Sequence, residues 1–159
     1  MASFDTSGIQ ELISEMRRMG EAGGEVARAM TLAAAEEIRT VWRKTAEDFG
    51  LIDTGAMVDS VTYPNEPTEI GGIFIIDVYP QGTDARGVRN AEKAFILHYG
   101  SSRLPPTYWV DEADKRSAEP VRARLESIWS EFLESGKVPT VDIAPAAKGR
   151  VTKTRSKTR

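Results

Sequence analysis

Residues 25–50, EVARAMTLAAAEEIRTVWRKTAEDFG, constrain the fold most, because their apolar side chains recur every three or four residues. Val26, Met30 and Ile38 belong to this pattern, which is typical of a helix with one buried face. Three consecutive alanines at 33–35 leave a narrow face that another backbone can approach closely. We therefore predict a core helix with a charged outer face.

A shorter amphipathic helix is predicted before it, over about residues 9–19. Ser7 and Gln10 have the spacing of a capping box at its start. The segment GEAGG at 20–24 then follows, and each glycine in a helix costs roughly 1 kcal/mol relative to alanine. We expect these glycines to interrupt or bend the helical region, and Gly50 to end it as a C′ residue.

Two short strands are predicted in the middle of the chain. VTYP at 61–64 is the first, and the β-branched and aromatic residues of 73–79 form the second. The connecting residues 65–72 suggest an antiparallel hairpin. A single hairpin is rarely stable alone, so we expect it to pack on the long helix or to pair with another chain.

Two short helices flank these strands in the sequence. Thr54 is suited to cap a helix of one or two turns that begins at Gly55. Asn90 is suited to cap a helix of about two and a half turns, which Gly100 ends. The residues 81–90 before that helix contain two glycines and three charges, which predicts a long exposed loop.

A last helix is predicted after the double proline, with Thr107 as its cap and Gly136 as its end. Acidic residues crowd its first turns, where they suit the positive end of the helix dipole. Pro120 lacks the N–H that a helix interior requires, so we expect a kink or a break near 117–120.

The charge is divided unevenly between body and tail. Residues 136–159 carry seven lysines or arginines and one aspartate, a net charge of +6, whereas the whole chain is at −3 and residues 1–135 are therefore at −9. We predict one α+β domain over 1–136, in which a long N-terminal helix and a C-terminal helix pack on a small antiparallel β-sheet. A disordered or extended basic arm over 137–159 should follow, because it is poor in apolar side chains.

The residue types that catalysis or metal binding needs are scarce. His98 is the only histidine and there is no cysteine, so the three or four imidazole or thiolate ligands of a zinc site are missing. Asp111, Glu112 and Asp114 are better explained by the helix dipole than by a magnesium site. We predict no catalytic residue, metal or cofactor. The N-terminus lacks the pattern of a signal peptide and no run is apolar enough to span a membrane, so we expect a soluble protein.

The order of the elements, with the segments DTGAMVDSV and AFILHYGSSRLPPTYWVDEA, resembles the tail-completion, or head–tail joining (neck), proteins of long-tailed bacteriophages. Those proteins carry a TG-x-L-x-x-S segment after the long helix, then E-[FY]-G-[TS] and a P-[FY] step into the last helix. The resemblance covers about residues 26–135. His98 stands where the family shows glutamate, so we carry over no contact for that side chain. The matching residues are Thr54, Gly55, Met57 (for leucine), Ser60, Tyr99, Gly100, Ser101, Pro106, Tyr108 and Ala113.

This resemblance implies a structural protein of the virion neck, which is in the host cytoplasm during assembly. Its expected partners are copies of itself in a six-fold ring and neighbouring neck, tail-terminator or tail-tube proteins, with possible contact to DNA and none to a membrane. We predict that exposed cations contribute to these contacts, both in the loops and in the arm. They are Arg86, Arg89, Arg103, Lys148, Arg150, Lys153, Arg155, Lys157 and Arg159.

A nucleic-acid-binding module is the alternative function. The tail KGRVTKTRSKTR places a cation at about every second or third position, which suits sequence-independent, salt-sensitive binding to phosphates. It contains no aromatic residue for base stacking, and the acidic body would repel nucleic acid. An acidic surface on a neighbouring subunit is therefore the partner that we prefer for the arm.

Overall fold

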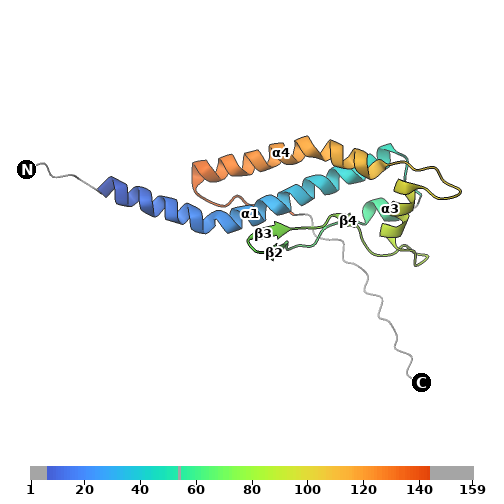
Figure 1. Ribbon diagram of the computed structural model, residues 1–159, viewed down its shortest axis with the longest axis horizontal. Helices are drawn as coiled ribbons and strands as arrows, with labels where there is room; N and C mark the ends of the chain where they lie inside the picture. The colour runs from blue at the N-terminus through green and yellow to red at the C-terminus, as the bar shows by residue number, and fades with distance from the viewer. Residues whose placement is uncertain (1–6, 54, 144–159) are drawn as a thin grey trace, which may run out of the picture.

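The computed structural model describes residues 7–53 and 55–143, with side chains from residue 11 onward. It contains four helices and four short strands in these ranges. Figure 1 shows two long antiparallel helices, with the strands along one of them and the two shorter helices at the end where the other begins. The elements are α1 (Ser7–Asp48), α2 (Ala56–Asp59), β1 (Val61–Thr62), β2 (Thr68–Ile70), β3 (Ile73–Ile75), β4 (Tyr79–Pro80), α3 (Asn90–Tyr99) and α4 (Trp109–Ser135).

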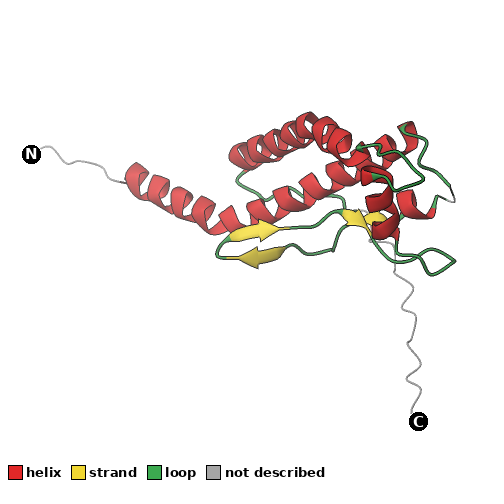
Figure 2. Cartoon of the chain, turned by 45° about the vertical axis from the view of Figure 1, so that its right-hand side comes forward, coloured by secondary structure: helices red, strands yellow, loops and turns green. Residues whose placement is uncertain are grey.

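Helix α1 is one helix of 42 residues, so the interruption expected at residues 20–24 is absent. The other expectation, a bend, agrees with the change of direction that Figures 1 and 2 show in the N-terminal part of α1. A Cβ added at Gly20, Gly23 or Gly24 would meet nothing within 4 Å, so no close packing requires these glycines. The described buried side chains of α1 begin after them, at Val26, where packing supplies most of the helical stability. The expected N-terminal and core helices are therefore parts of a single element.

Contacts at both ends show that α1 and α4 pair as antiparallel helices. At one end, the Trp42 indole N–H donates to Asp114 at 3.0 Å and the Arg116 guanidinium lies 2.8 Å from the Asp48 carboxylate. At the other end, a Cβ added at Gly136 would lie 3.7 Å from the Glu15 carboxylate. The first turns of α1 extend beyond α4, as Figures 1 and 2 show.

The strands pair as two nested antiparallel ladders, which differs from the single predicted hairpin. The outer ladder joins β1 to β4 with Val61 opposite Pro80, and the inner ladder joins β2 to β3 with Ile70 opposite Ile73. Gly71 and Gly72 form the inner turn, and both have the positive φ that a tight two-residue turn requires. Residues 68–72, which were expected to belong to the connection, thus form a strand and a turn.

Two groups of buried side chains form the core, and the α+β fold class is confirmed. Trp109, Met57, Val58, Ala46 and Ala94 make the first group, between α1, α2, α3 and α4. Leu32, Ala35 and Tyr63 make the second, between α1 and the strand region. Burial, followed by the hydrogen bond from the Tyr63 hydroxyl to Glu36, raises the pKa of that phenol.

The chain beyond α4 turns back onto the body. Gly136 ends α4 with a φ of +65°, Pro139 is buried, and Ile143 packs against the second core group. Residues 137–143 therefore belong to the body, although they were expected to be part of the basic arm. The basic arm that we predict is therefore limited to the residues after Ile143. These residues, 144–159, lie outside the described ranges.

The predicted caps of α3 and α4 are wrong in detail. Asn90 is the first residue of α3, and its side-chain amide donates to the Gln81 carbonyl instead of capping. Thr107 donates its hydroxyl to the Leu97 carbonyl, and α4 begins after Tyr108. Of the two outcomes expected near Pro120, a kink or a break, the break is absent, because α4 is one helix through this residue. Its buried side chains, among them Ile128 and Phe132, pack on α1 and offset one lost hydrogen bond.

Candidate assembly interface

The described residues expose many large apolar side chains, and three groups of them lie on separate elements. We call them the α1 stripe, the hairpin face and the α3 face. Soluble monomers rarely expose large contiguous apolar patches, so such groups point to contacts with other molecules. The α1 stripe is Leu12, Ile13 and Met16, the hairpin face is Ile70, Ile73 and Ile75, and the α3 face is Phe95, Ile96 and Tyr99.

The α3 face exists because α3 buries its smaller and polar side chains. Asn90, Ala94 and His98 recur every fourth residue and all three are buried. The opposite side of the helix therefore carries Phe95 and Tyr99, which are 62% and 57% exposed, and their ring centroids lie 4.7 Å apart. An isolated subunit would leave this aromatic pair in water, whereas an assembly would bury it.

The segment after α3 brings the proline and aromatic motif residues together. Ser101 and Leu104 exchange backbone hydrogen bonds of 2.8 and 3.2 Å, which close a tight turn. Gly100 has a φ of +80°, as expected for the end of a helix, and a Cβ there would lie 2.7 Å from the Leu104 oxygen and the Pro106 nitrogen. The turn therefore needs glycine both for its backbone conformation and for space.

His98 serves as a capping group in this turn. Its Nδ1 accepts a hydrogen bond of 3.3 Å from the Val110 backbone N–H, which is one of the donors that the start of α4 leaves unpaired. The ring is buried edge-on between Tyr99 and Tyr108, and its Nε2 lies 3.7 Å from the Asp111 carboxylate. These contacts give the imidazole a positioning role between α3 and α4.

Three predicted interface arginines lie at this end of the molecule. Arg86, Arg89 and Arg103 are exposed, and none of their guanidinium groups has a partner among the described residues. Arg86 and Arg89 lie in the loop before α3, and contacts with the Asp84 side chain hold this loop together. This carboxylate accepts the backbone N–H groups of Arg86 and Val88 at 2.9 Å, and it pairs with Lys93. The pKa of Asp84 is lowered, chiefly by the Lys93 ammonium and to a smaller extent by these N–H groups.

The motif residues around α2 have structural positions. Gly55 precedes α2 with a φ of +74°, Met57 is buried in the core, and Ser60 ends the helix with its hydroxyl donating to the Met57 carbonyl at 2.7 Å. Thr54 lies outside the described residues, and so do the arm cations Lys148, Arg150, Lys153, Arg155, Lys157 and Arg159. The predicted cap at Thr54 and the contacts of the arm therefore remain predictions.

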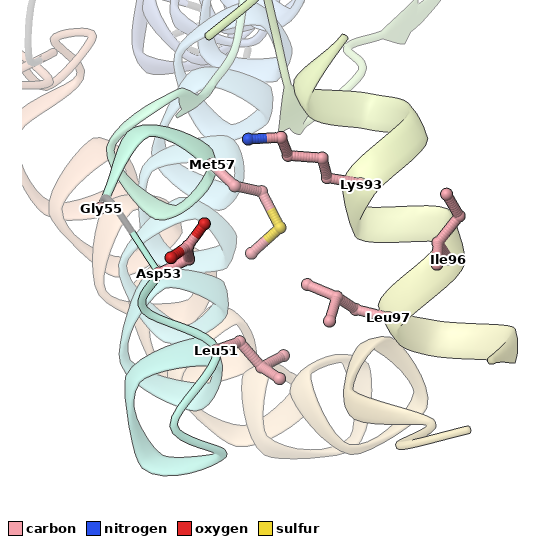
Figure 3. A pocket seen from close by; sticks show the side chains of 7 residues that line it. All are labelled: Leu51, Asp53, Gly55, Met57, Lys93, Ile96 and Leu97. Atoms are coloured by element: carbon pink, nitrogen blue, oxygen red, sulfur yellow. The ribbon is translucent and has the colours of Figure 1, made fainter. Parts of the chain in front are cut away.

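A small apolar cavity lies beside the α3 face (Figure 3). Its volume is about 220 Å³, below the 300–1,000 Å³ of most ligand sites. Ile96 belongs both to the cavity wall and to the α3 face. A cavity of this size and lining suits one apolar side chain better than a substrate. The lining residues are Leu51, Asp53, Gly55, Met57, Lys93, Ile96 and Leu97.

Sequence reasoning placed the arginines correctly on exposed loops but missed the three apolar groups. The hairpin was expected to pack on the long helix or to pair with another chain, and no prediction was made of which side chains it exposes. In the structure Ile73 and Ile75 are exposed while Phe74 between them is partly buried. The alternation of side chains in a strand, together with Ile70 opposite Ile73, was the available signal. For Phe95 and Tyr99, the signal was that the four-residue spacing of Asn90, Ala94 and His98 leaves them on the other side.

Within the described ranges, no group of three or more His, Asp or Glu side chains is placed to hold a metal ion, and no helix is long and apolar enough to cross a membrane. No protein-family model, curated protein or solved structure matches the chain.

Proposed function

We propose that this protein is a structural subunit of the ring-shaped neck that joins head and tail in a long-tailed bacteriophage. Copies of the chain form the ring, which the resemblance implies to be six-fold, and neighbouring neck, tail-terminator or tail-tube proteins contact its faces. The virion is its site of action, and assembly takes place in the host cytoplasm.

The observation that carries this proposal is the presence of three separate exposed apolar groups on one small chain. A ring subunit needs two different surfaces for its two neighbours, because a ring closes through head-to-tail contacts. It also needs a further surface for the components above or below it. The α1 stripe, the hairpin face and the α3 face supply three surfaces on three different elements.

The basic arm has a supporting role in this proposal. Contacts between exposed charges are largely screened beyond about 8 Å at physiological salt, so the arm must lie close to its partner. A neighbouring acidic body is the partner that we propose, since a ring places several bodies of net charge −9 side by side.

Removal of the arm separates this function from nucleic-acid binding. We test a chain truncated after Ile143, which keeps the packed residues 137–143. We expect this chain to be incorporated into particles as well as the full chain at high salt, and at a reduced level at low salt. Incorporation is measured by quantitative immunoblotting of purified particles. The matched control keeps the full length but replaces the six arm cations, Lys148, Arg150, Lys153, Arg155, Lys157 and Arg159, with glutamine.

The opposite pattern would support the nucleic-acid reading. In that case both variants fail to assemble at any salt concentration, while the full chain binds duplex DNA with an affinity that falls steeply as salt rises.

A further inference from the structure

The two ends of the molecule differ in charge. At the end where α1 begins and α4 ends, residues 11–25 and 126–137 hold seven acidic and three basic side chains, a net charge of −4. The contact between Gly136 and Glu15 places these two segments together. The acidic residues are Glu11, Glu15, Glu21, Glu25, Glu126, Glu131 and Glu134, and the basic ones are Arg17, Arg18 and Lys137.

The end that carries α3 presents basic side chains on its loops. Residues 81–108 hold Arg86, Arg89, Lys93 and Arg103 against Asp84 and Glu92, a net charge of +2, and Lys93 is already paired with Asp84. Two exposed carboxylates from other segments also lie at this end, Asp53 in the cavity wall and Asp111 at 3.7 Å from His98, and they bring the sum from +2 to 0. The three arginines have no partner among the described residues and are the groups that can meet an acidic neighbour. Figures 1 and 2 show α3 and the start of α1 at opposite ends of the long axis.

Each of these two ends has an apolar centre. At the acidic end, Leu12 and Met16 lie one helical turn apart and are 59% and 64% exposed, and Ile13 widens the stripe. The first buried side chain of α1 among the described residues is Val26, so the preceding turns gain little from the rest of the subunit. At the end that carries α3, the α3 face lies beside the cavity that Ile96 lines.

The cavity fits one side chain of the stripe. An apolar cavity of about 150 Å³ is large enough to hold a benzene ring, so one of about 220 Å³ accommodates a methionine or leucine side chain. Met16 is unbranched and adapts to irregular apolar space, which makes it the best candidate. Phe95 and Tyr99 would then cover Leu12 and Ile13.

We propose that the α1 stripe of one copy docks on the α3 face of the next copy, and that this contact closes the ring. The acidic end then meets the unpaired arginines of its neighbour. Docking stripe against stripe would instead oppose two ends of charge −4, and like charges across an interface are unfavourable. The inference rests on the proposed ring but makes a separate claim, namely which two surfaces meet.

Cysteine cross-linking tests the pairing directly, because the chain has no cysteine of its own. Leu12→Cys and Tyr99→Cys are prepared as single variants and as a double variant, all at exposed positions, and are treated with a short bismaleimide. We expect a mixture of the two single variants to give a cross-linked dimer, each single variant alone to give none, and the double variant to give a ladder up to the ring size. Ile73→Cys on the hairpin face, which is 66% exposed, is the matched control and should not link to either.

Three results would overturn the pairing. Leu12→Cys alone could form dimers, which would mean a two-fold contact between stripes. Ile73→Cys could replace Tyr99→Cys as the partner of Leu12→Cys. Rings could also form, as seen by electron microscopy, without any link between Leu12→Cys and Tyr99→Cys, in which case the proposed function stands and this inference fails. A chain that forms neither rings nor links in particles contradicts the proposed function itself.

Charge reversal provides a second readout of the same contact. Arg86→Glu, Arg89→Glu and Arg103→Glu together should lower the rate of cross-linking to Leu12→Cys about tenfold at low salt. Glu11→Lys, Glu15→Lys and Glu131→Lys in the partner should restore it. Loss without rescue would mean that these arginines do not face the acidic end.

Discussion

Trp109→Ala is expected to lower the free energy of unfolding by about 3–5 kcal/mol, the range for truncation of a buried aromatic side chain. Trp109 is fully buried, and its ring meets Trp42 edge-on with centroids 5.6 Å apart. Its indole N–H also points to the Ala94 carbonyl of α3 at 3.4 Å. One side chain thus connects α1, α3 and α4. Urea denaturation followed by circular dichroism measures the loss.

Trp129→Ala is the control for this change, because Trp129 lies on the same helix but is 46% exposed. Its truncation should cost less than half as much as that of Trp109. Equal losses for the two variants would show that Trp109 does not hold the three helices together.

Gly100→Ala is expected to destabilise the protein by about 2–6 kcal/mol. A φ of +80° with a ψ of −177° belongs to a region that is essentially restricted to glycine, and a residue with a side chain pays roughly 1–3 kcal/mol there. The added Cβ would also lie 2.7 Å from two backbone atoms of the turn, Leu104 O and Pro106 N, and such overpacking costs about 1–3 kcal/mol more.

Gly87→Ala separates these two causes. Gly87 has nearly the same φ, +81°, but a Cβ there would meet nothing within 4 Å. It should therefore cost only about 1–2 kcal/mol, the usual penalty of a left-handed conformation. Thermal unfolding of both variants gives the comparison. Losses of the same size would mean that the turn can move to accept a side chain, and that the fit around Gly100 is not restrictive.

The sequence predicted the helices well where the periodicity of their apolar residues was strong. Val26 and Ala33 are buried as the pattern of the long helix requires, and Met30 and Ile38 are partly buried, whereas the buried Leu32 lies outside that pattern. Local rules failed where packing between helices outweighs them. Pro120 weakens a helix by an amount that local reasoning can state, but α4 continues through it because its contact with α1 offsets that cost. The glycines at 20–24 precede Val26, the first described buried side chain of α1, and the helix bends in this part without ending.

The strands were predicted in the right region, but of the predicted pairing between 61–64 and 73–79 only the pair Thr62 and Tyr79 is present. Their apolar and β-branched composition identifies residues that favour strands, but pairing depends on where the chain turns. The Gly71–Gly72 turn shortens the hairpin and leaves Val61 and Thr62 to pair with residues beyond it. The exposed isoleucines of β3 follow from this register, which composition alone does not determine.

The candidate interface could be predicted only in part for a similar reason. Exposed arginines in a loop rich in glycine and charge are visible in a sequence, because such loops lie on the surface. The α1 stripe is also visible as a periodic pattern, but the same pattern predicts burial in the protein's own core. Only the three-dimensional arrangement shows that α4 ends before it covers Leu12 and Met16.

A cryo-electron microscopy reconstruction of virus particles assembled with the full-length chain tests whether this protein is a subunit of the neck ring. We expect a closed ring of copies between the head and the tail, in which each copy contacts its two neighbours through different surfaces. Absence of the chain from purified infectious particles, or its presence only alongside packaged DNA inside the head, would show that it is not a subunit of such a ring.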